Sequence, residues 1–254
     1  MSLSNTPRHI FFQTRKNIEA WLTLISHSEK CRLPRGTAAA SLLDSRLENH
    51  RKRARSKAVQ SEHADERWLR EIEATLLAYR RMIDATVDQL SDEALWQRPG
   101  DEFNSVAVLL RHLGGNLKSR WSDFMTTDGE KPNRNREKEF EDWEGNRQSL
   151  LEYFDEGWAE LTSAVKSLDS GNIERTISIR GEPHSIAQAL LRSLTHITYH
   201  TGQITMAARM VHNGPWKWLT IAPGNSAEFN SQNWGEASSR AVFAQKTKSD
   251  KPDK

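Results

Sequence analysis

The sequence predicts an all-α fold: a four-helix bundle with one long crossover and a small extended segment before the last bundle helix. Apolar residues recur at three- and four-residue steps in four long segments between residues 65 and 211, which is the pattern of amphipathic helices. Good helix-capping residues precede several of these segments. One polar connection is longer than usual. This pattern favours a helix bundle over an alternating α/β fold.

The first two predicted helices follow from their apolar faces. The first begins at about Asp65, and its face consists of Trp68, Leu69, Ile72, Leu76, Tyr79, Ile83, Val87 and Leu90. Ser91 can cap a short following turn, and Pro99-Gly100 then breaks the chain. The second helix begins near Asn104 or Ser105, runs to about Met125, and has its face at Val106, Leu109, Leu110, Leu113 and Leu117.

The long crossover separates the second helix from the third. Its polar stretch runs from Asp128 to Arg136, and loops of this kind often border a site. The third helix is predicted from about Glu137 to Leu168, with Phe140, Trp143, Leu150, Leu151, Phe154, Trp158, Leu161 and Val165 on its apolar face. Ile173 to Pro183 suggests an extended segment or hairpin. Ser185 and Gln188 match a capping box, and the fourth helix continues to about Val211, followed by coil after Gly214.

Charge divides the chain into parts. Residues 1–63 contain twelve Lys or Arg against five acidic residues, a net of +7, and the remaining 24 basic and 29 acidic residues give a net of −5. We expect a basic N-terminal extension over 1–63 that is disordered or reflects a misassigned start, a bundle domain over 64–235, and a disordered Lys-rich tail over 236–254. A transit peptide or a nucleic-acid tether are alternatives for the extension, although the charge is only weak support for nucleic-acid binding.

Two absences in the sequence bound the compartment. Cys31 is the only cysteine, so an intrachain disulfide or a thiolate metal cluster cannot form, and a reducing, cytoplasmic location fits best. No run of about 18 apolar residues is present, so we expect no membrane association.

Histidines are the candidate metal ligands. His196 and His200 are four residues apart on the fourth predicted helix and therefore share a face, although such a pair is also compatible with two hydrogen-bonded side chains. His112 continues the apolar Leu109–Leu113 face of the second helix, where a buried imidazole needs a partner. We predict that the three histidines bind one divalent metal ion with a position left open, which is a catalytic arrangement.

The donor set suits zinc, nickel, iron or copper without separating them. No Glu lies between His196 and His200, so the general base of the zinc-protease signature is missing and a peptidase of that type is not expected.

Two longer motifs resemble the DinB-like (YfiT-like) superfamily of small four-helix metal proteins, and the stretches 120–124, 126–132 and 218–224 resemble an uncharacterised domain-of-unknown-function branch of it. The two longer motifs are Arg111-His112-Leu113-Gly114-Gly115-Asn116 and Leu194-Thr195-His196-Ile197-Thr198-Tyr199-His200-Thr201-Gly202-Gln203. The resemblance covers about residues 65–235, places the metal-binding histidines at His112, His196 and His200, and implies a homodimer. The extension before residue 65 departs from it.

The resemblance also implies a reaction. Relatives include S-transferases that join bacillithiol or mycothiol to electrophiles, a thiol-dependent isomerase, and proteins described as hydrolases. We therefore expect a divalent-metal-dependent enzyme that activates a thiol or water for attack on a small electrophile, with a low-molecular-weight thiol as a candidate partner. The alternatives are a metal-dependent hydrolase, or a non-enzymatic bundle that binds metal or ligand in a stress response.

Three polar residues near the histidines are further candidates for catalysis. Asn116 and Arg120 follow His112 by four and eight residues, and Gln203 follows His200 by three, so each can face the same cavity. They are expected to support the ligands or, in the case of Arg120, to capture an anionic substrate group. The alternatives are a surface salt bridge for Arg120 and helix-packing hydrogen bonds for Asn116 and Gln203.

Overall fold

The computed structural model describes residues 38–233, which are mainly helical, so the predicted all-α fold is confirmed. In chain order the elements are α2 (Ala38–Val87), α3 (Asp92–Trp96), α4 (Val106–Trp121), the 3-10 helix η3 (Glu137–Phe140), α5 (Arg147–Lys166), β1 (Thr176–Ile179), β2 (Glu182–Ser185), α6 (Ile186–Val211) and α7 (Ser226–Asn233). No helix of the described residues is both long and apolar enough to span a membrane.

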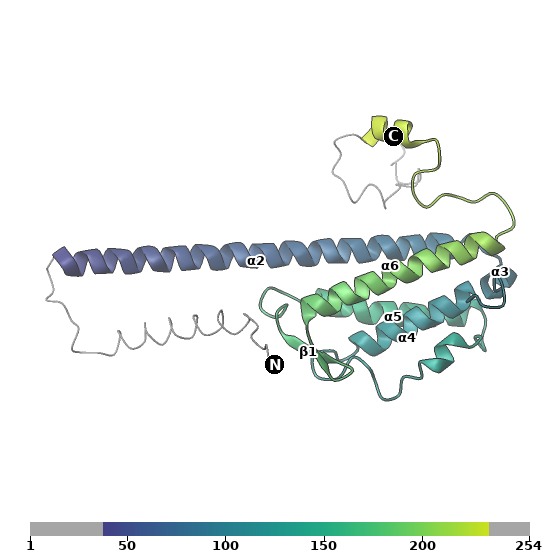
Figure 1. Ribbon diagram of the computed structural model, residues 1–254, viewed down its shortest axis with the longest axis horizontal. Coiled ribbons are helices and arrows are strands. Elements are labelled where there is room, and N and C mark those ends of the chain that lie inside the picture. Colours follow the sequence, from purple (N-terminus) through teal and green to yellow (C-terminus); the bar gives the residue numbers. More distant parts are fainter. Residues whose placement is uncertain (1–37, 234–254) are drawn as a thin grey trace, which may run out of the picture. The chain divides into compact units, whose positions relative to one another are not determined.

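Four helices, α2, α4, α5 and α6, form the bundle, and α4, α5 and α6 lie side by side (Figure 1). Their apolar faces meet in one core, to which each helix contributes fully or nearly fully buried side chains: Leu76 and Ile83; Leu110, Leu113 and Leu117; Leu150, Phe154 and Leu161; Ile186, Leu190, Ile197 and Ile204. Burial of each such side chain contributes roughly 1.5–3 kcal/mol. The core therefore fixes the relative positions of the helices that carry the candidate site residues.

Helix α2 is longer than its apolar pattern predicts. It begins at Ala38, whereas a start at about Asp65 was expected. The described side chains between residues 45 and 64 are exposed, so this stretch has no apolar face from which a helix could be recognised. The expectations for residues 1–37 and for the tail over 236–254 fall outside the described residues.

Capping residues set most of the other helix starts. The side-chain oxygens of Ser91 and Ser105 accept hydrogen bonds from the backbone N–H groups of Ala94 and Val108, and Ser185 forms the predicted capping box with Gln188. These predicted caps are confirmed. A prediction about the last part of the chain was wrong, because the coil expected after Gly214 contains α7.

The predicted third helix is wrong over its first ten residues. Residues 137–140 form the separate turn η3, and α5 begins only at Arg147, where the Asn146 side chain accepts a hydrogen bond from Ser149 N–H. Glu139 within η3 is buried and ion-paired inside the protein, and the chain leaves η3 at Glu141 in an extended conformation, so the helical course is interrupted there. The second helix also ends earlier than predicted, at Trp121.

The small extended segment is a two-stranded antiparallel hairpin in which Thr176 pairs with Ser185 and Ile179 with Glu182. Its two-residue turn, Arg180-Gly181, has positive φ at both positions, 57° and 74°, as the common tight hairpin turn requires. The Asp128 carboxylate accepts hydrogen bonds of 2.8 Å from both turn N–H groups. The crossover loop and the hairpin are thereby held together beside the end of α4.

Candidate metal centre

Three imidazoles from two helices meet at one point. His112 Nε2 of α4 lies 3.3 Å from His196 Nε2 of α6, which lies 3.1 Å from His200 Nε2 one turn later. One ligand atom from each lies within 4.8 Å of those of the others. His112 and His200 are buried, at 4% and 7% exposure, and His196 is half-buried. The structure thus brings together all three histidines that the sequence singled out, in a group that could hold a metal ion.

Two of the three nitrogen separations match a metal site. Nitrogens bound to zinc at 2.0–2.1 Å with tetrahedral angles lie about 3.3 Å from one another, close to the His112–His196 and His196–His200 separations given above, while the ligand atoms of His112 and His200 lie within 4.8 Å of each other. Without a cation, His196 Nε2 faces two ring nitrogens at once and has one proton at most to share between them. A divalent ion would use all three lone pairs, so the donor set suits a metal better than a proton.

Glu139 fixes the orientation of His112. Its Oε2 lies 2.9 Å from His112 Nδ1, and both side chains are only 5% exposed. An ionised carboxylate only accepts hydrogen bonds, so the proton lies on Nδ1 and the lone pair of Nε2 points to the other histidines. Metal-binding histidines are commonly held by a carboxylate in this way.

Arg134 keeps Glu139 ionised. Its Nε and Nη2 contact the two oxygens of Glu139, each at 2.7 Å. Burial alone would raise the pKa of Glu139, but the hydrogen bonds from His112 and Arg134, with the charge of Arg134, outweigh burial and lower the pKa. The crossover loop thus supplies a buried guanidinium whose position depends on the carboxylate that holds His112.

His196 and His200 are neutral at physiological pH. Burial, followed by the neighbouring His200 and His112 and by Arg120, lowers the pKa of His196 to about 3. Burial and His112 lower the pKa of His200 to about 4, against the opposing effect of the Gln203 side chain. Neutral imidazole is the form that binds metals.

Gln203 lies behind the site. Its Oε1 and the Nδ1 atoms of His196 and His200 are buried without a hydrogen-bond partner in the described part of the chain, and the Gln203 side chain acts on the pKa of His200. It does not line the cavity beside the histidines. This placement fits support of His200 better than contact with a substrate.

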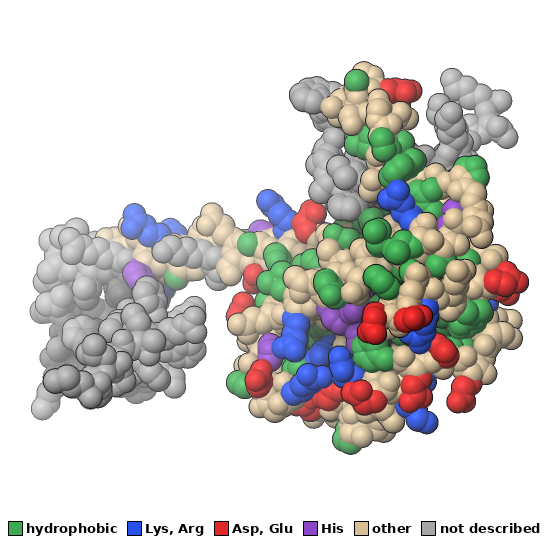
Figure 2. Space-filling view, turned by 45° about the vertical axis from the view of Figure 1, so that its right-hand side comes forward, with side chains coloured by type: hydrophobic (Ala, Val, Ile, Leu, Met, Phe, Trp, Pro, Cys, Tyr) green, Lys and Arg blue, Asp and Glu red, His purple; other side chains and the backbone are tan. Residues whose placement is uncertain are grey.

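A cavity of about 200 Å³ opens beside the histidines. It is lined by His112 and His196, by Asn116 and Arg120 as expected, and also by Arg134, Arg136, Arg180, Arg192 and Ser193. Figure 2 shows Lys and Arg side chains gathered next to histidine on this side of the bundle. Two of the three predicted catalytic residues therefore face the same space as the ligands. Arg134 and Arg136 place the crossover loop at the wall of this cavity.

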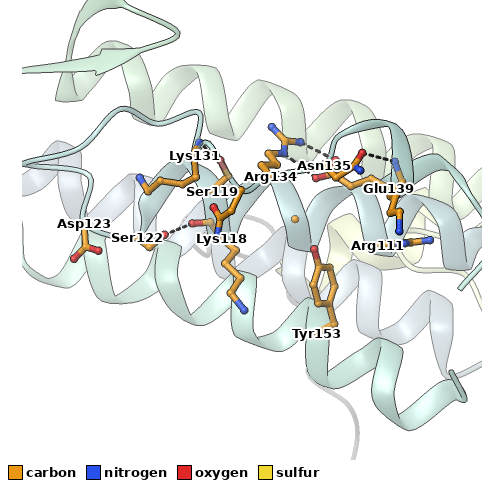
Figure 3. A pocket seen from close by; sticks show the side chains of 13 residues that line it. Arg111, Lys118, Ser119, Ser122, Asp123, Lys131, Arg134, Asn135, Glu139 and Tyr153 are labelled. Carbon is orange, nitrogen blue, oxygen red and sulfur yellow. Dashed lines mark hydrogen bonds and ion pairs between the residues drawn. The ribbon is translucent and has the colours of Figure 1, made fainter. Parts of the chain in front are cut away.

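A larger cavity, about 540 Å³, is lined by Arg134 and Glu139 among other residues (Figure 3). The Tyr153 side chain of α5 projects into it, below Arg134 and Glu139, and burial raises the pKa of the Tyr153 phenol. The rest of its lining is polar apart from Gly115 and includes the basic residues Arg111, Lys118, Lys131 and Lys138. None of the three histidines lines this cavity, so the candidate metal centre opens only on the smaller one of these two cavities.

Sequence reasoning missed Glu139 and four of the arginines. Glu139 was assigned to a helix. Arg134 and Arg136 lie in a loop, Arg180 lies in a hairpin turn, and Arg192 lies at an exposed helix position. None of them belongs to a short motif, so no local signal distinguishes them from surface charges. The single usable signal was the length and polarity of the crossover loop.

Comparison with known proteins gives one family. The model of a family described as "Protein of unknown function (DUF1572)" matches residues 63–225, more than half of the chain and a stretch that contains all three histidines. No curated protein matches. No solved structure matches either.

Proposed function

The chain belongs to the family described as protein of unknown function (DUF1572), and we propose that it is a metal-dependent enzyme of the DinB-like type. In this proposal His112, His196 and His200 bind one divalent ion. The observation that carries it is the spacing of their nitrogens, 3.1 and 3.3 Å for the two neighbouring pairs, beside an open cavity.

The open cavity favours an enzyme over a binding protein. Three nitrogen donors leave a zinc-like ion with a further position, which catalytic sites use and structural sites fill with a fourth protein ligand. No fourth His, Cys, Asp or Glu joins the group among residues 38–233. Instead, His112 and His196 face a space of about 200 Å³.

The reaction we propose is attack by an activated nucleophile on a small electrophile. When bound, the ion supplies Lewis-acid chemistry, lowering the pKa of a thiol or a water so that it is a nucleophile at neutral pH. The residues of the chain hold the parts in place: Glu139 orients His112, and Asn116 and Arg120 face the space in which a substrate would lie. We propose thiol transfer, as in bacillithiol or mycothiol S-transferases, with hydrolysis of a small molecule as the competing reaction.

Metal analysis tests the centre. The full-length protein, loaded with zinc, nickel or iron and then desalted, is expected to retain about one ion per chain. The His112→Ala/His200→Ala variant should retain none, and the control His63→Ala, at an exposed position of α2, should match the wild type. Circular dichroism checks that the double variant is folded. Equal metal content in the wild type and the double variant would end the metal proposal.

A conjugation assay tests the reaction. Metal-loaded protein is incubated with bacillithiol, mycothiol, glutathione or coenzyme A, each with a model electrophile, and products are identified by mass spectrometry. A conjugate formed by the wild type but not by the double histidine variant supports S-transfer. No conjugate with any thiol, but hydrolysis of the electrophile by the metal-loaded form, would move the proposal to a hydrolase.

A further inference from the structure

The cavity beside the histidines is lined by five arginines from four separate segments. Arg120 comes from α4, Arg134 and Arg136 from the crossover loop, Arg180 from the hairpin turn and Arg192 from α6. None of the described residues that line it is Asp or Glu. Such a concentration of one charge beside a proposed reaction centre requires an explanation.

Nearby carboxylates neutralise only part of this charge. Glu139 is shared between Arg134 and His112, and Glu130 lies 3.3 Å from Arg134 and 3.1 Å from Arg180. Two acidic side chains therefore already serve two of the arginines and a histidine. Arg136 contacts Glu137 at 3.6 Å, but Glu137 is exposed and does not line the cavity.

Arg120 is the least compensated of the five. Its side chain is buried, at 5% exposure, and in the described part of the chain it makes no hydrogen bond and no ion pair; Nη1 is buried without a partner. Gly129 covers it so closely that an added Cβ would lie 3.1 Å from Arg120 Cδ. Burial, followed by the charge of Arg192, lowers the pKa of Arg120 to about 10. The alternative of a surface salt bridge for Arg120 is therefore wrong.

Arg192 is the neighbour with which Arg120 can share an anion. It is exposed at the cavity, and its nearest partner is His184, whose Nε2 lies 3.4 Å from Nη1. Among the neighbouring charged groups, Arg192 has the largest effect on the pKa of Arg120. Two guanidinium groups that face one space without an acidic partner form a site whose energy is lowered when an anion enters.

We propose that Arg120 and Arg192 bind a carboxylate or phosphate group of the substrate, so that the substrate of this centre is a small organic anion. The cavity of about 200 Å³ is below the usual range of roughly 300–1,000 Å³ for drug-sized ligands, so the part of the substrate that enters is small. The term substrate rests on the proposed function, whereas the binding of the anion can be measured without any reaction.

Calorimetric titration of the full-length, metal-free protein tests the site. The probes are inorganic phosphate and malonate, with uncharged malonamide as the matched control, in a low-salt buffer because salt screens such contacts. We expect phosphate or malonate to bind and malonamide not to bind. If neither anion binds the wild type at millimolar concentration, or if malonamide binds as well as malonate, the inference is overturned.

Three variants locate the binding. Arg120→Met should raise the dissociation constant roughly tenfold or more, the loss expected for a charge-assisted hydrogen bond. Arg192→Gln should raise it as well, and this variant cannot unfold the core because Arg192 is exposed. Arg70→Met, at an exposed arginine of α2, should leave it unchanged. Equal affinity in Arg120→Met, Arg192→Gln and the wild type would show that the anion binds elsewhere.

The metal proposal and the anion proposal can be disproved separately. If the His112→Ala/His200→Ala variant still binds the anion while the wild type retains no metal, the anion site stands and the proposed metal enzyme does not. If the anion binds only metal-loaded protein and Arg120→Met does not weaken it, the anion is a ligand of the ion alone. That result overturns the arginine site and leaves the proposed function in place.

Discussion

His112 Nδ1 and Glu139 Oε2 lie 2.9 Å apart, and both side chains are buried, although the residues are 27 positions apart in the chain. The contact joins the second bundle helix to a short 3-10 turn at the end of the crossover loop. It decides which nitrogen of His112 faces His196 and His200. A residue of this short 3-10 turn, which the apolar pattern assigns to a continuous helix, thus orients a candidate metal ligand.

Glu139→Gln should weaken metal binding about 10- to 100-fold, the usual effect of removing a carboxylate that orients a ligand histidine. The amide keeps the size of the side chain but loses the charge that holds Nδ1–H and Arg134. Competition with a chromophoric zinc chelator measures the affinity. Glu137→Gln, on the same 3-10 turn but 87% exposed, is the matched control. An unchanged affinity in Glu139→Gln would contradict the role given to this contact.

Arg134→Met should lower the free energy of unfolding, whereas Arg120→Met should not. Arg134→Met leaves the buried Glu139 without its main partner, and breaking a buried pair costs roughly 3–5 kcal/mol. Arg120 has no such pair, so replacing it with an apolar side chain of similar length should leave the free energy of unfolding unchanged or raise it by up to about 2 kcal/mol. Urea unfolding in a buffer free of phosphate and carboxylates measures both variants. A large loss in Arg120→Met would indicate a structural role for this arginine.

The bundle could be predicted because its information is local. A helix that buries one face repeats apolar residues every three or four positions, so α4, α6 and the buried part of α2 could be located, with Ser91, Ser105 and Ser185 as caps. The three histidines could be found for the same reason, since two share a helix face and the third interrupts an apolar one. The extension of α2 before residue 65 could not be predicted, because its described side chains between residues 45 and 64 are exposed and do not form an apolar face.

The surroundings of the histidines depend on tertiary contacts and could not be predicted. Phe140 and Trp143 continue an apolar period into residues that do not belong to α5, so Glu139 was placed on a helix instead of against His112. Arg180 reaches the cavity from the hairpin turn and Arg192 from an exposed position of α6, so the two are brought together only by the tertiary fold. Their sequence neighbours are those of ordinary surface residues, so spacing carried no information about them.

Asp128→Asn should destabilise the protein by an amount that depends on pH. Hydrogen bonds from Ser178, from the backbone N–H of Gly181 and from that of Glu130 hold the pKa of Asp128 far below its ordinary 3.8. A carboxylate whose pKa is depressed by folding contributes stability that is complete above the unfolded pKa and is lost as the pH falls towards the folded pKa. The loss at pH 7 should be roughly 1–3 kcal/mol.

Urea unfolding at pH 7, 5, 4 and 3 measures this dependence. The difference between the wild type and Asp128→Asn should be constant above about pH 5 and should shrink below about pH 4. Asp101→Asn, in an exposed part of the loop before α4, should change the unfolding free energy by less than about 0.5 kcal/mol at pH 7. A difference for Asp128→Asn that grows as the pH falls would contradict the depressed pKa.

Two glycine-to-alanine substitutions should act in opposite directions. At Gly157 an added Cβ would lie 2.2 Å from the carbonyl oxygen of Gly114, so α4 and α5 must move apart, and overpacking of this kind costs roughly 1–3 kcal/mol. At Gly202, within α6, an added Cβ meets nothing within 4 Å, and alanine should add about 0.5–1 kcal/mol through its helix preference.

Thermal and urea unfolding of Gly157→Ala and Gly202→Ala, followed by circular dichroism, shows directly whether each substitution lowers or raises the free energy of unfolding. Because the histidines lie on α4 and α6, a shift of α4 should also weaken zinc binding in Gly157→Ala, while Gly202→Ala should bind zinc like the wild type. A loss of stability in Gly202→Ala would mean that this exposed face of α6 is covered in solution. Light scattering would then decide whether a second copy of the chain covers it, since the homodimer expected from the sequence doubles the mass and a monomer does not.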